Sequence, residues 1–186
     1  MASPAPTARG WTYHRYLELD DEHRYEILDG ELLMTPAPGT RHQRIVEELQ
    51  YRFARWVRQY NTGLLLPAPT DVVLAEDVVV QPDLLFIRAA RVAEIVDERA
   101  VQGAPDLVVE ILSPSSLERD RHRKREQYRR YGVPEFWIVD PANRAIEVLA
   151  LQGEEYRLAS FAANSGAVAS RVLEGFAVSV AEVMEE

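Results

Sequence analysis

The chain has 186 residues, 47% of them hydrophobic, which is typical of one globular domain with a substantial core. It has no cysteine, which excludes disulfide and thiolate chemistry, and its four scattered histidines argue against a zinc site. The net charge of −9 argues against non-specific binding of nucleic acid over the whole surface.

The N-terminal residues MASPAPTARG contain no hydrophobic stretch, and no apolar run approaches the roughly 18 residues of a membrane span. We therefore expect neither a secretory signal nor a transmembrane helix, and no membrane partner. The expected organisation is a mobile tail over 1–12 and a single domain over 13–186, in a cytoplasmic protein.

The first third of the chain predicts a short helix over 13–20, a hairpin over 25–34 and a long helix. In the hairpin, Asp29-Gly30 favours a tight type I′ turn. Thr40 is expected to cap the long helix, which runs to about residue 60. Its apolar stripe, with His42 on the same side in the first turn, follows helical spacing and consists of Ile45, Val46, Leu49, Phe53, Trp56, Val57 and Tyr60.

The middle third predicts two long strands, LLLPAPTDVVLAE and DVVVQPDLLFIR, because β-branched residues dominate both segments. They are separated by a turn near Glu76-Asp77, and a short helix follows in AARVAEIVDERA. The segment APDLVVEILS is an almost continuous apolar run. That pattern is typical of a central strand covered on both faces.

The last third predicts a helix, a buried strand and a hairpin. Ser115 and Glu118 form a capping box for a helix over about 116–131, which ends at Gly132-Val-Pro134. EFWIVD is a buried strand, AIEVLAL and EYRLASF form the hairpin, and the C-terminal segment adds a strand and a helix. This order predicts an α/β (α+β) fold, with a mixed β-sheet flanked by helices and extra β-hairpins.

Two carboxylates lie in strands that should be buried. Alternation along 106–112 places Glu110 on one face with Val108 and Leu112, and Asp83 lies in QPDLLF at the start of another strand. An unpaired carboxylate in such a place is costly, so it should be protonated, paired or bound to a metal. For either acid alone, capping a strand end or pairing with an arginine is an equal alternative.

Lys124 is the single lysine among 21 basic side chains, in the segment 119–130, which has seven basic and two acidic residues. The inward stripe of the predicted helix contains Leu117, Lys124 and Tyr128, so the lysine should face the sheet and reach its Glu110 end. A solvated place on a basic helix face is the alternative. Arginine fills every other basic position, however, and a compact ammonium is harder to replace.

Two acids and a lysine at one edge of a sheet suit metal-dependent hydrolysis of a phosphodiester. Carboxylates and a backbone carbonyl are hard oxygen ligands for Mg²⁺. The metal would activate a bound water and stabilise charge on the phosphate. The lysine would orient the water and offset the developing negative charge.

Several motifs follow one another in the chain: YEILDGELLM, RHQRIVEEL, VVQPDLLFI, GAPDLVVEILSPSS and DRHRKREQYRRYGVPEFWIVD. A PD before an apolar strand, 27 residues ahead of an acid in a second strand, resembles the PD-(D/E)XK nuclease superfamily. The whole set resembles more closely the Uma-two family of restriction-endonuclease-like proteins. This similarity is collinear from about Tyr25 to Leu158.

The resemblance implies a restriction-endonuclease-like fold and an endonuclease that cleaves DNA with Mg²⁺ or Mn²⁺. It implies Asp83 and Glu110 as the metal-ligand acids and the backbone carbonyl of Ile111 as a further ligand. The superfamily has its lysine two residues after the second acid, where this chain has Leu112. The resemblance then implies that Lys124, on the neighbouring helix, has taken the place of that lysine.

Further residues are weaker candidates. His42 and Glu31 lie in motifs of the family and are candidate accessory residues; a capping or core histidine and a solvent-facing hairpin acid are the alternatives. Three arginines of the basic segment are candidates for contacts with DNA phosphates, with a solvated helix face as the alternative: Arg121, Arg123 and Arg125.

Two other functions fit the same residues. A catalytically inactive nuclease-fold module that binds DNA or protein fits Leu112 and the acidic net charge. Binding of a divalent cation that depends on Asp83 would separate the enzyme from this module. A metal-dependent hydrolase of RNA or of a smaller phosphoester is a third interpretation. The resemblance also implies a homodimer, which would suit cutting of both DNA strands.

Overall fold

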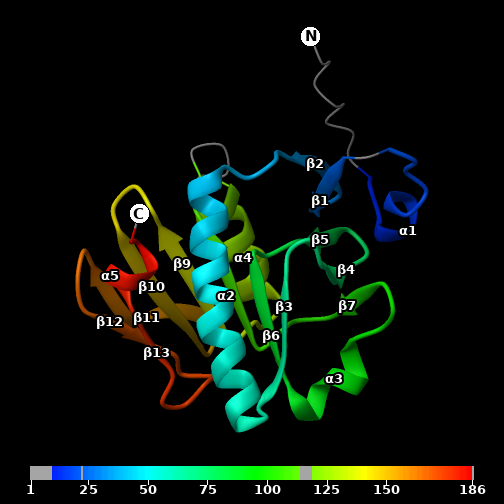
Figure 1. The fold of residues 1–186 in the computed structure, drawn as a ribbon. Coiled ribbons are helices and arrows are strands. Elements are labelled where there is room, and N and C mark those ends of the chain that lie inside the picture. Colours follow the sequence, from blue (N-terminus) through cyan, green and yellow to red (C-terminus); the bar gives the residue numbers. More distant parts are fainter. Residues whose placement is uncertain (1–9, 22, 114–118, 186) are drawn as a thin grey trace.

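The structure is a computed structural model that describes residues 10–21, 23–113 and 119–185, with the side chains of 119–121 outside the description. Within these residues a six-stranded and a five-stranded sheet pack with helices against them (Figure 1). The expected mixed fold is confirmed, although the strands are divided between two main sheets. Residues 1–9 of the expected tail lie outside the described residues.

The larger sheet contains the strand that carries Glu110. In spatial order its strands are β11 (Glu155–Ala163), β10 (Ala145–Gln152), β9 (Glu135–Asp140), β8 (Leu107–Ile111), β6 (Leu84–Arg88) and β3 (Gly63–Pro67). β8 runs parallel to β9 and antiparallel to β6. Every residue of β8 is buried, which confirms the expected central strand with both faces covered.

The smaller sheet contains the N-terminal hairpin. In spatial order its strands are β2 (Glu31–Thr35), β1 (Arg24–Leu28), β5 (Val78–Val80), β4 (Asp71–Ala75) and β7 (Ala100–Gln102). A separate pair consists of β12 (Ala167–Ala169) and β13 (Ala177–Ser179). In the hairpin, Asp29 and Gly30 have φ angles of 52° and 74°, and a type I′ turn needs positive values at both positions. The predicted hairpin is confirmed.

The longest helix covers one face of the larger sheet (Figure 1). The helices are α1 (Tyr13–Tyr16), α2 (Thr40–Tyr60), α3 (Ala89–Ile95), the π-helix η1 (Arg119–Lys124), α4 (Arg125–Arg130) and α5 (Val180–Val183). α2 packs through a stripe with steps of four residues: Ile45, Leu49, Phe53 and Val57. In the part of the chain that the structure describes, no helix is long and apolar enough to cross a membrane.

Two expectations about α2 are wrong. Gly39 occupies the N-cap position without a side-chain hydrogen bond, and Thr40 begins the helix rather than capping it. Tyr60 is exposed, because it is the last residue of α2 and the buried stripe of the helix ends at Val57. Its ring lies against Trp56 at 4.3 Å between centroids instead of entering the core.

The helix predicted over 116–131 is present where the structure describes it, but its first half is a π-helix. η1 leads directly into α4, which ends at Arg130. The expected capping box of Ser115 and Glu118 lies outside the described residues.

The two long strands predicted between 64 and 88 are each split between the sheets. β3 and β6 belong to the larger sheet, while β4 and β5 belong to the smaller one. The breaks fall around Pro69 and Pro82, because proline has no N–H to donate to a strand ladder. Gln81 and Asp83 therefore lie on a connection that passes from one sheet to the other.

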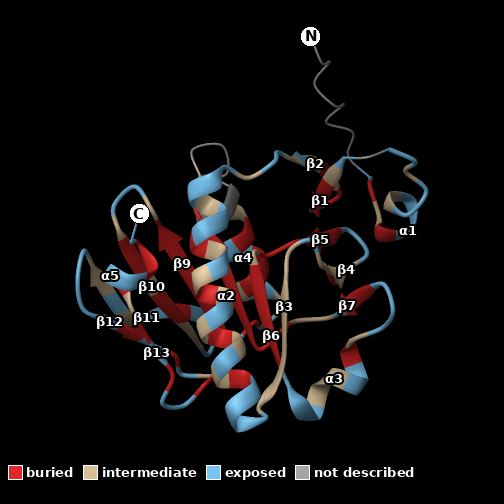
Figure 2. Ribbon diagram, viewed as in Figure 1, coloured by how far each residue is buried: buried red, intermediate tan, exposed pale blue. Residues whose placement is uncertain are grey.

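Two cores lie on opposite faces of the larger sheet. One is formed with α2 and contains Phe53 and Trp137, whose rings meet at 5.3 Å. The second lies between the two sheets and α4, and it contains Leu28, Val108 and Tyr128. The strands between these cores are almost entirely buried (Figure 2).

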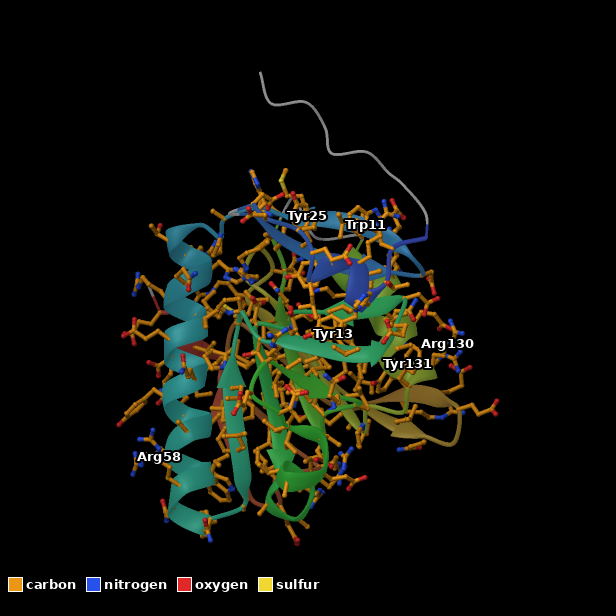
Figure 3. The ribbon with its side chains drawn as sticks, turned by 90° about the vertical axis from the view of Figure 1, so that its right-hand side faces the viewer. Trp11, Tyr13, Tyr25, Arg58, Arg130 and Tyr131 are labelled. Atoms are coloured by element: carbon orange, nitrogen blue, oxygen red, sulfur yellow. The ribbon has the colours of Figure 1, made fainter. Side chains whose placement is uncertain are left out.

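A third apolar cluster covers the outer face of the smaller sheet. Trp11, Tyr13 and Tyr25 belong to it (Figure 3), whereas Arg58 of α2 lies well away from them. The smaller sheet is therefore covered on both faces. Its inner face, which carries Leu28, meets the face of β8 that carries Val108 and Glu110.

Candidate active site

Glu110 is buried in the core between the two sheets, with 2% of its surface exposed. Lys124 Nζ donates to both carboxylate oxygens, at 3.0 and 3.1 Å. The hydroxyl of Tyr128 donates to Oε1 at 2.6 Å. Pairing with a cationic side chain is one of the outcomes expected for a buried acid, and here these donors replace water around the carboxylate.

Lys124 lies between two glutamates and is 3% exposed. It ends η1, and Tyr128 follows one helical turn later on the same side. Besides its contacts with Glu110, the ammonium lies 2.7 Å from Oε1 of Glu26. The lysine therefore faces the sheet and reaches Glu110, as its position on the inward stripe predicts, while its catalytic role stays a prediction.

Glu26 belongs to this cluster and was absent from the sequence-based candidates. β1 carries it into the core, where it is 1% exposed and accepts a hydrogen bond at 2.8 Å from the backbone N–H of Gln81. Alternation in β1 places Glu26 on the same face as Leu28. A carboxylate on the apolar face of a strand is the signal that identified Glu110, and applied to this hairpin it would have identified Glu26.

Contacts between the helical segment formed by η1 and α4 and the β1–β2 hairpin support the cluster of Glu26, Lys124 and Glu110. Arg123 donates to Glu31 at 2.9 Å, and Gln127 donates from Nε2 to Asp29 at 2.8 Å. These contacts join η1 to the first residue of β2 and α4 to the turn that follows β1. Glu31, a candidate accessory residue, is thus engaged with Arg123, a candidate phosphate contact, beside the cluster rather than inside it.

Asp83 lies where the connection between the sheets enters β6. Its Oδ2 accepts a hydrogen bond at 2.7 Å from the backbone N–H of Ile111, the residue after Glu110. The same oxygen lies 3.2 Å from Nε2 of His42, in the first turn of α2. The side chains of Asp83 and His42 are 17% and 15% exposed, so this part of the site is closer to solvent than Glu110.

The two acids predicted as metal ligands occupy neighbouring strand positions. β6 pairs with β8 so that Leu84 lies opposite Val109. One further step in this antiparallel register places Asp83 opposite Glu110. The fold therefore brings together two residues that the sequence separates by 27 positions.

Comparison with known proteins identifies the family. The model of the Uma2 family, described as "Putative restriction endonuclease", matches residues 12–181. The chain belongs to the Uma2 family. This confirms the family resemblance seen in the sequence, since Uma2 and Uma-two are the same family.

A solved structure shares the Uma2 chain's fold. The crystal structure of "a putative nuclease belonging to DUF820" from Anabaena variabilis superposes with a TM-score of 0.78 at 19% sequence identity, covering 94% of this chain and 98% of the other. At this identity the likeness establishes a nuclease-like fold alone. No curated protein matches the chain.

Among the described side chains, three carboxylates lie at or near Lys124. Glu26 and Glu110 flank the one ammonium of Lys124, and Asp83 lies nearby. Asp71, next in the network through Gln81, feels the same environment: burial raises the pKa of its carboxyl, and the charge of Glu26 acts in the same direction. Arg24, which donates to Gln81, acts on the Asp71 carboxyl in the opposite direction and lowers its pKa.

The residues that the structure describes contain no group of three or more His, Cys, Asp or Glu side chains that could hold a metal ion. A metal at Asp83 and Glu110 would therefore need ligands of another kind, such as a backbone carbonyl or water.

The three candidate phosphate-binding arginines have different surroundings. Arg123 is in the ion pair with Glu31. Arg125 is exposed and lines a recess of about 310 Å³ together with His122 and Arg129. The side chain of Arg121 lies outside the described residues.

Tyr128→Phe should lower the free energy of unfolding by about 1–2 kcal/mol, because Glu110 loses a buried hydroxyl donor. The ring can keep its packing on Phe136, 5.2 Å away between centroids. Urea denaturation measures the loss. Tyr131→Phe, three residues later with its ring under Arg130, is the matched control and should change stability by less than about 0.5 kcal/mol. Equal effects of the two substitutions would contradict a supporting role of the Tyr128 hydroxyl.

Proposed function

We propose that this Uma2 chain is a divalent-metal-dependent endonuclease that hydrolyses DNA phosphodiester bonds, with Asp83 and Glu110 as metal ligands and Lys124 as the assisting cation. The observation that supports this most directly is the contact of Lys124 with both oxygens of Glu110, inside a nuclease-like fold. Leu112 stands where the superfamily has its lysine, and the helical segment supplies the ammonium from another direction.

The residues present fit Mg²⁺ or Mn²⁺. Asp83 and Glu110 offer hard carboxylate oxygens at opposed strand positions, and Mg²⁺ in proteins is usually held by one or two carboxylates together with water. The backbone carbonyl of Ile111 is the proposed further ligand. When bound, the ion would lower the pKa of a water molecule and neutralise charge on the phosphate.

The side chains around the acids have separate tasks in this proposal. The Nζ of Lys124 lies beside Glu110, and its ammonium would offset the negative charge that develops on the phosphate. Asp83 is oriented by the N–H of Ile111 and by His42. His42 is therefore proposed as an accessory residue that positions Asp83.

DNA is the proposed substrate because the description of the Uma2 family is "Putative restriction endonuclease". Arg125 is the proposed phosphate contact. It is exposed on α4, the helix whose Tyr128 donates a hydrogen bond to Glu110. A homodimer and a cytoplasmic location belong to the same proposal. Gel filtration with light scattering would measure the oligomeric state.

Wild-type protein should cleave supercoiled plasmid in Mg²⁺ or Mn²⁺, and Asp83→Asn or Glu110→Gln should each lower the rate at least about 100-fold. Both substitutions keep the size of the side chain but remove the charge that would bind the ion. Agarose gels of a time course measure the rate, and circular dichroism checks that each variant is folded. Glu94→Gln, on the exposed surface of α3, is the matched control and should cleave like the wild type.

Equal cleavage by all four proteins, purified identically, would identify a contaminating nuclease. Cleavage of RNA or of a small phosphoester, with plasmid left intact, would replace the proposed substrate. Absence of cleavage together with absence of Asp83-dependent Mn²⁺ binding in calorimetry would instead support the inactive binding module. Leu112, buried beside the site, is the observation that favours that module.

A further inference from the structure

We propose that Glu26 is a positioning residue that keeps Lys124 in place when Glu110 binds a divalent cation. This inference rests on the proposed function and extends it to a strand of the other sheet. The contacts that carry it join three chain segments: β1, the end of β8 and the end of η1.

Among the described residues, two carboxylates lie against the ammonium of Lys124, at different distances. Its shortest contact is 2.7 Å, to Oε1 of Glu26, whereas the two oxygens of Glu110 lie at 3.0 and 3.1 Å. All three side chains are at most 3% exposed. Water therefore cannot easily take over the solvation of the ammonium if one carboxylate is withdrawn.

Glu110 cannot bind Lys124 and a metal ion equally strongly at the same time. The same two oxygens that accept from Lys124 are those that a divalent cation would bind. A divalent cation beside the ammonium also adds repulsion between like charges, which is strong where water is excluded. Binding at Glu110 therefore weakens its pairing with Lys124, and a second anion has to hold the lysine.

Glu26 is built to be that second anion, because other groups fix its position. The oxygen that meets Lys124 also accepts from the backbone N–H of Gln81. The side-chain amide of Gln81 is fixed by two hydrogen bonds. Its Oε1 accepts from Arg24 at 3.0 Å, and its Nε2 donates to Asp71 at 2.8 Å. Gln81 in turn lies two residues before Asp83. The connection between β5 and β6 therefore positions both Glu26 and Asp83.

Glu26→Gln is expected to weaken Mn²⁺ binding about 10–100-fold, the usual range for residues that support metal ligands. Glutamine has the same size and can still accept from Lys124 and Gln81 through Oε1, but it has no charge. Lys124 then pairs more strongly with Glu110, the acid that keeps its charge, and competes with the ion for its oxygens. Titration calorimetry with Mn²⁺ alone, without DNA, measures the affinity of the folded protein.

A double-mutant cycle separates this role from a general loss of charge. In a Lys124→Met background the lysine no longer competes, so adding Glu26→Gln should change the Mn²⁺ affinity by no more than about twofold. Asp71→Asn removes a carboxylate from the same network without touching Lys124, and it should weaken binding much less than Glu26→Gln does. This comparison decides the question even if Lys124→Met does not fold.

The outcomes separate the two proposals. If wild-type protein binds no Mn²⁺ and cleaves nothing, the proposed function fails and this inference fails with it. If wild-type protein binds Mn²⁺ and Glu26→Gln binds it equally well, the inference alone is overturned. Two further results would overturn it: an equal loss of Mn²⁺ affinity from Glu26→Gln with and without Lys124→Met, or an equal loss from Glu26→Gln and Asp71→Asn. In either case Glu26 would contribute only general negative charge and would not act through Lys124.

Discussion

Lys124→Met should lower the free energy of unfolding by about 3–5 kcal/mol, the usual cost of removing one partner from a buried ion pair. The substitution leaves Glu26 and Glu110 facing each other in the core without the cation that now lies between them. Methionine fills a similar volume, so little of the loss would come from a cavity. Urea denaturation followed by tryptophan fluorescence measures the change.

The neighbouring residue provides the control for Lys124→Met. Arg125→Met removes a positive charge at the next position, where the side chain is exposed, and should change stability by less than about 0.5 kcal/mol. A similar small change for Lys124→Met would mean that the ammonium does not compensate the glutamates. Cleavage and stability must be measured on the same samples, because a partly unfolded variant loses activity for a trivial reason.

A triple variant shows where the cost of Lys124→Met arises. Combining it with Glu26→Gln and Glu110→Gln removes the buried charges together, and replacing a whole buried ionic group is often neutral for stability. The triple variant should therefore recover most of the stability but none of the nuclease activity. That outcome would show that the two acids and the lysine serve chemistry rather than folding.

Much of the fold follows from local patterns in the sequence. The apolar run 107–112 predicts a strand covered on both faces, and β8 lies between two cores. Asp29-Gly30 predicts the hairpin because few residue pairs accept positive φ at both positions of a type I′ turn. In each case a feature of a few adjacent residues determines the local structure.

The division into two sheets could not be predicted in the same way. Pro69 and Pro82 mark where strands are interrupted, but nothing local says that β5 pairs with β1 while β6 pairs with β8. Those pairings join segments far apart in the chain. They depend on which apolar faces meet, and β-strand periodicity gives the face of a residue without giving its neighbour.

In the candidate site, too, local patterns predict some residues, whereas others depend on tertiary packing. Alternation and helical spacing place Glu110 and Lys124 on inward faces, and the structure joins them. The partner on the far side of the lysine, Glu26, lies 98 positions away in another sheet. Its inward face was readable in β1, but its contact with Lys124 depends on how the hairpin packs against η1.

Glu135, at the start of β9, is a buried carboxylate outside the Glu26–Lys124–Glu110 cluster, and its surroundings differ from those of Glu110. It is fully buried and accepts from Trp137 Nε1 and Ser170 Oγ, both at 2.7 Å, and from the backbone N–H groups of Arg171 and Val172. These donors are neutral groups. They hold the segment before β13 against the larger sheet, on the side of the core shared with α2.

Glu135→Gln should therefore lower the free energy of unfolding by about 2–4 kcal/mol, since hydrogen bonds to a charged acceptor are strong and unsatisfied buried donors are costly. Glutamine leaves no cavity, but its amide N–H₂ would face donors on one side, where Glu135 now accepts from Arg171 and Val172. Urea denaturation measures the loss, and Glu94→Gln, exposed on α3, is the control for the same chemical change.

Nuclease activity should respond differently to this substitution. Glu135 lies on the α2 side of the larger sheet, whereas Glu26, Glu110 and Lys124 lie on the other side. At a temperature where the variant is fully folded, Glu135→Gln should cleave DNA at the wild-type rate, while Lys124→Met should not cleave under the same conditions. Equal loss of activity from both would show that the two buried carboxylate sites are coupled through β9 and β8, which pair in parallel.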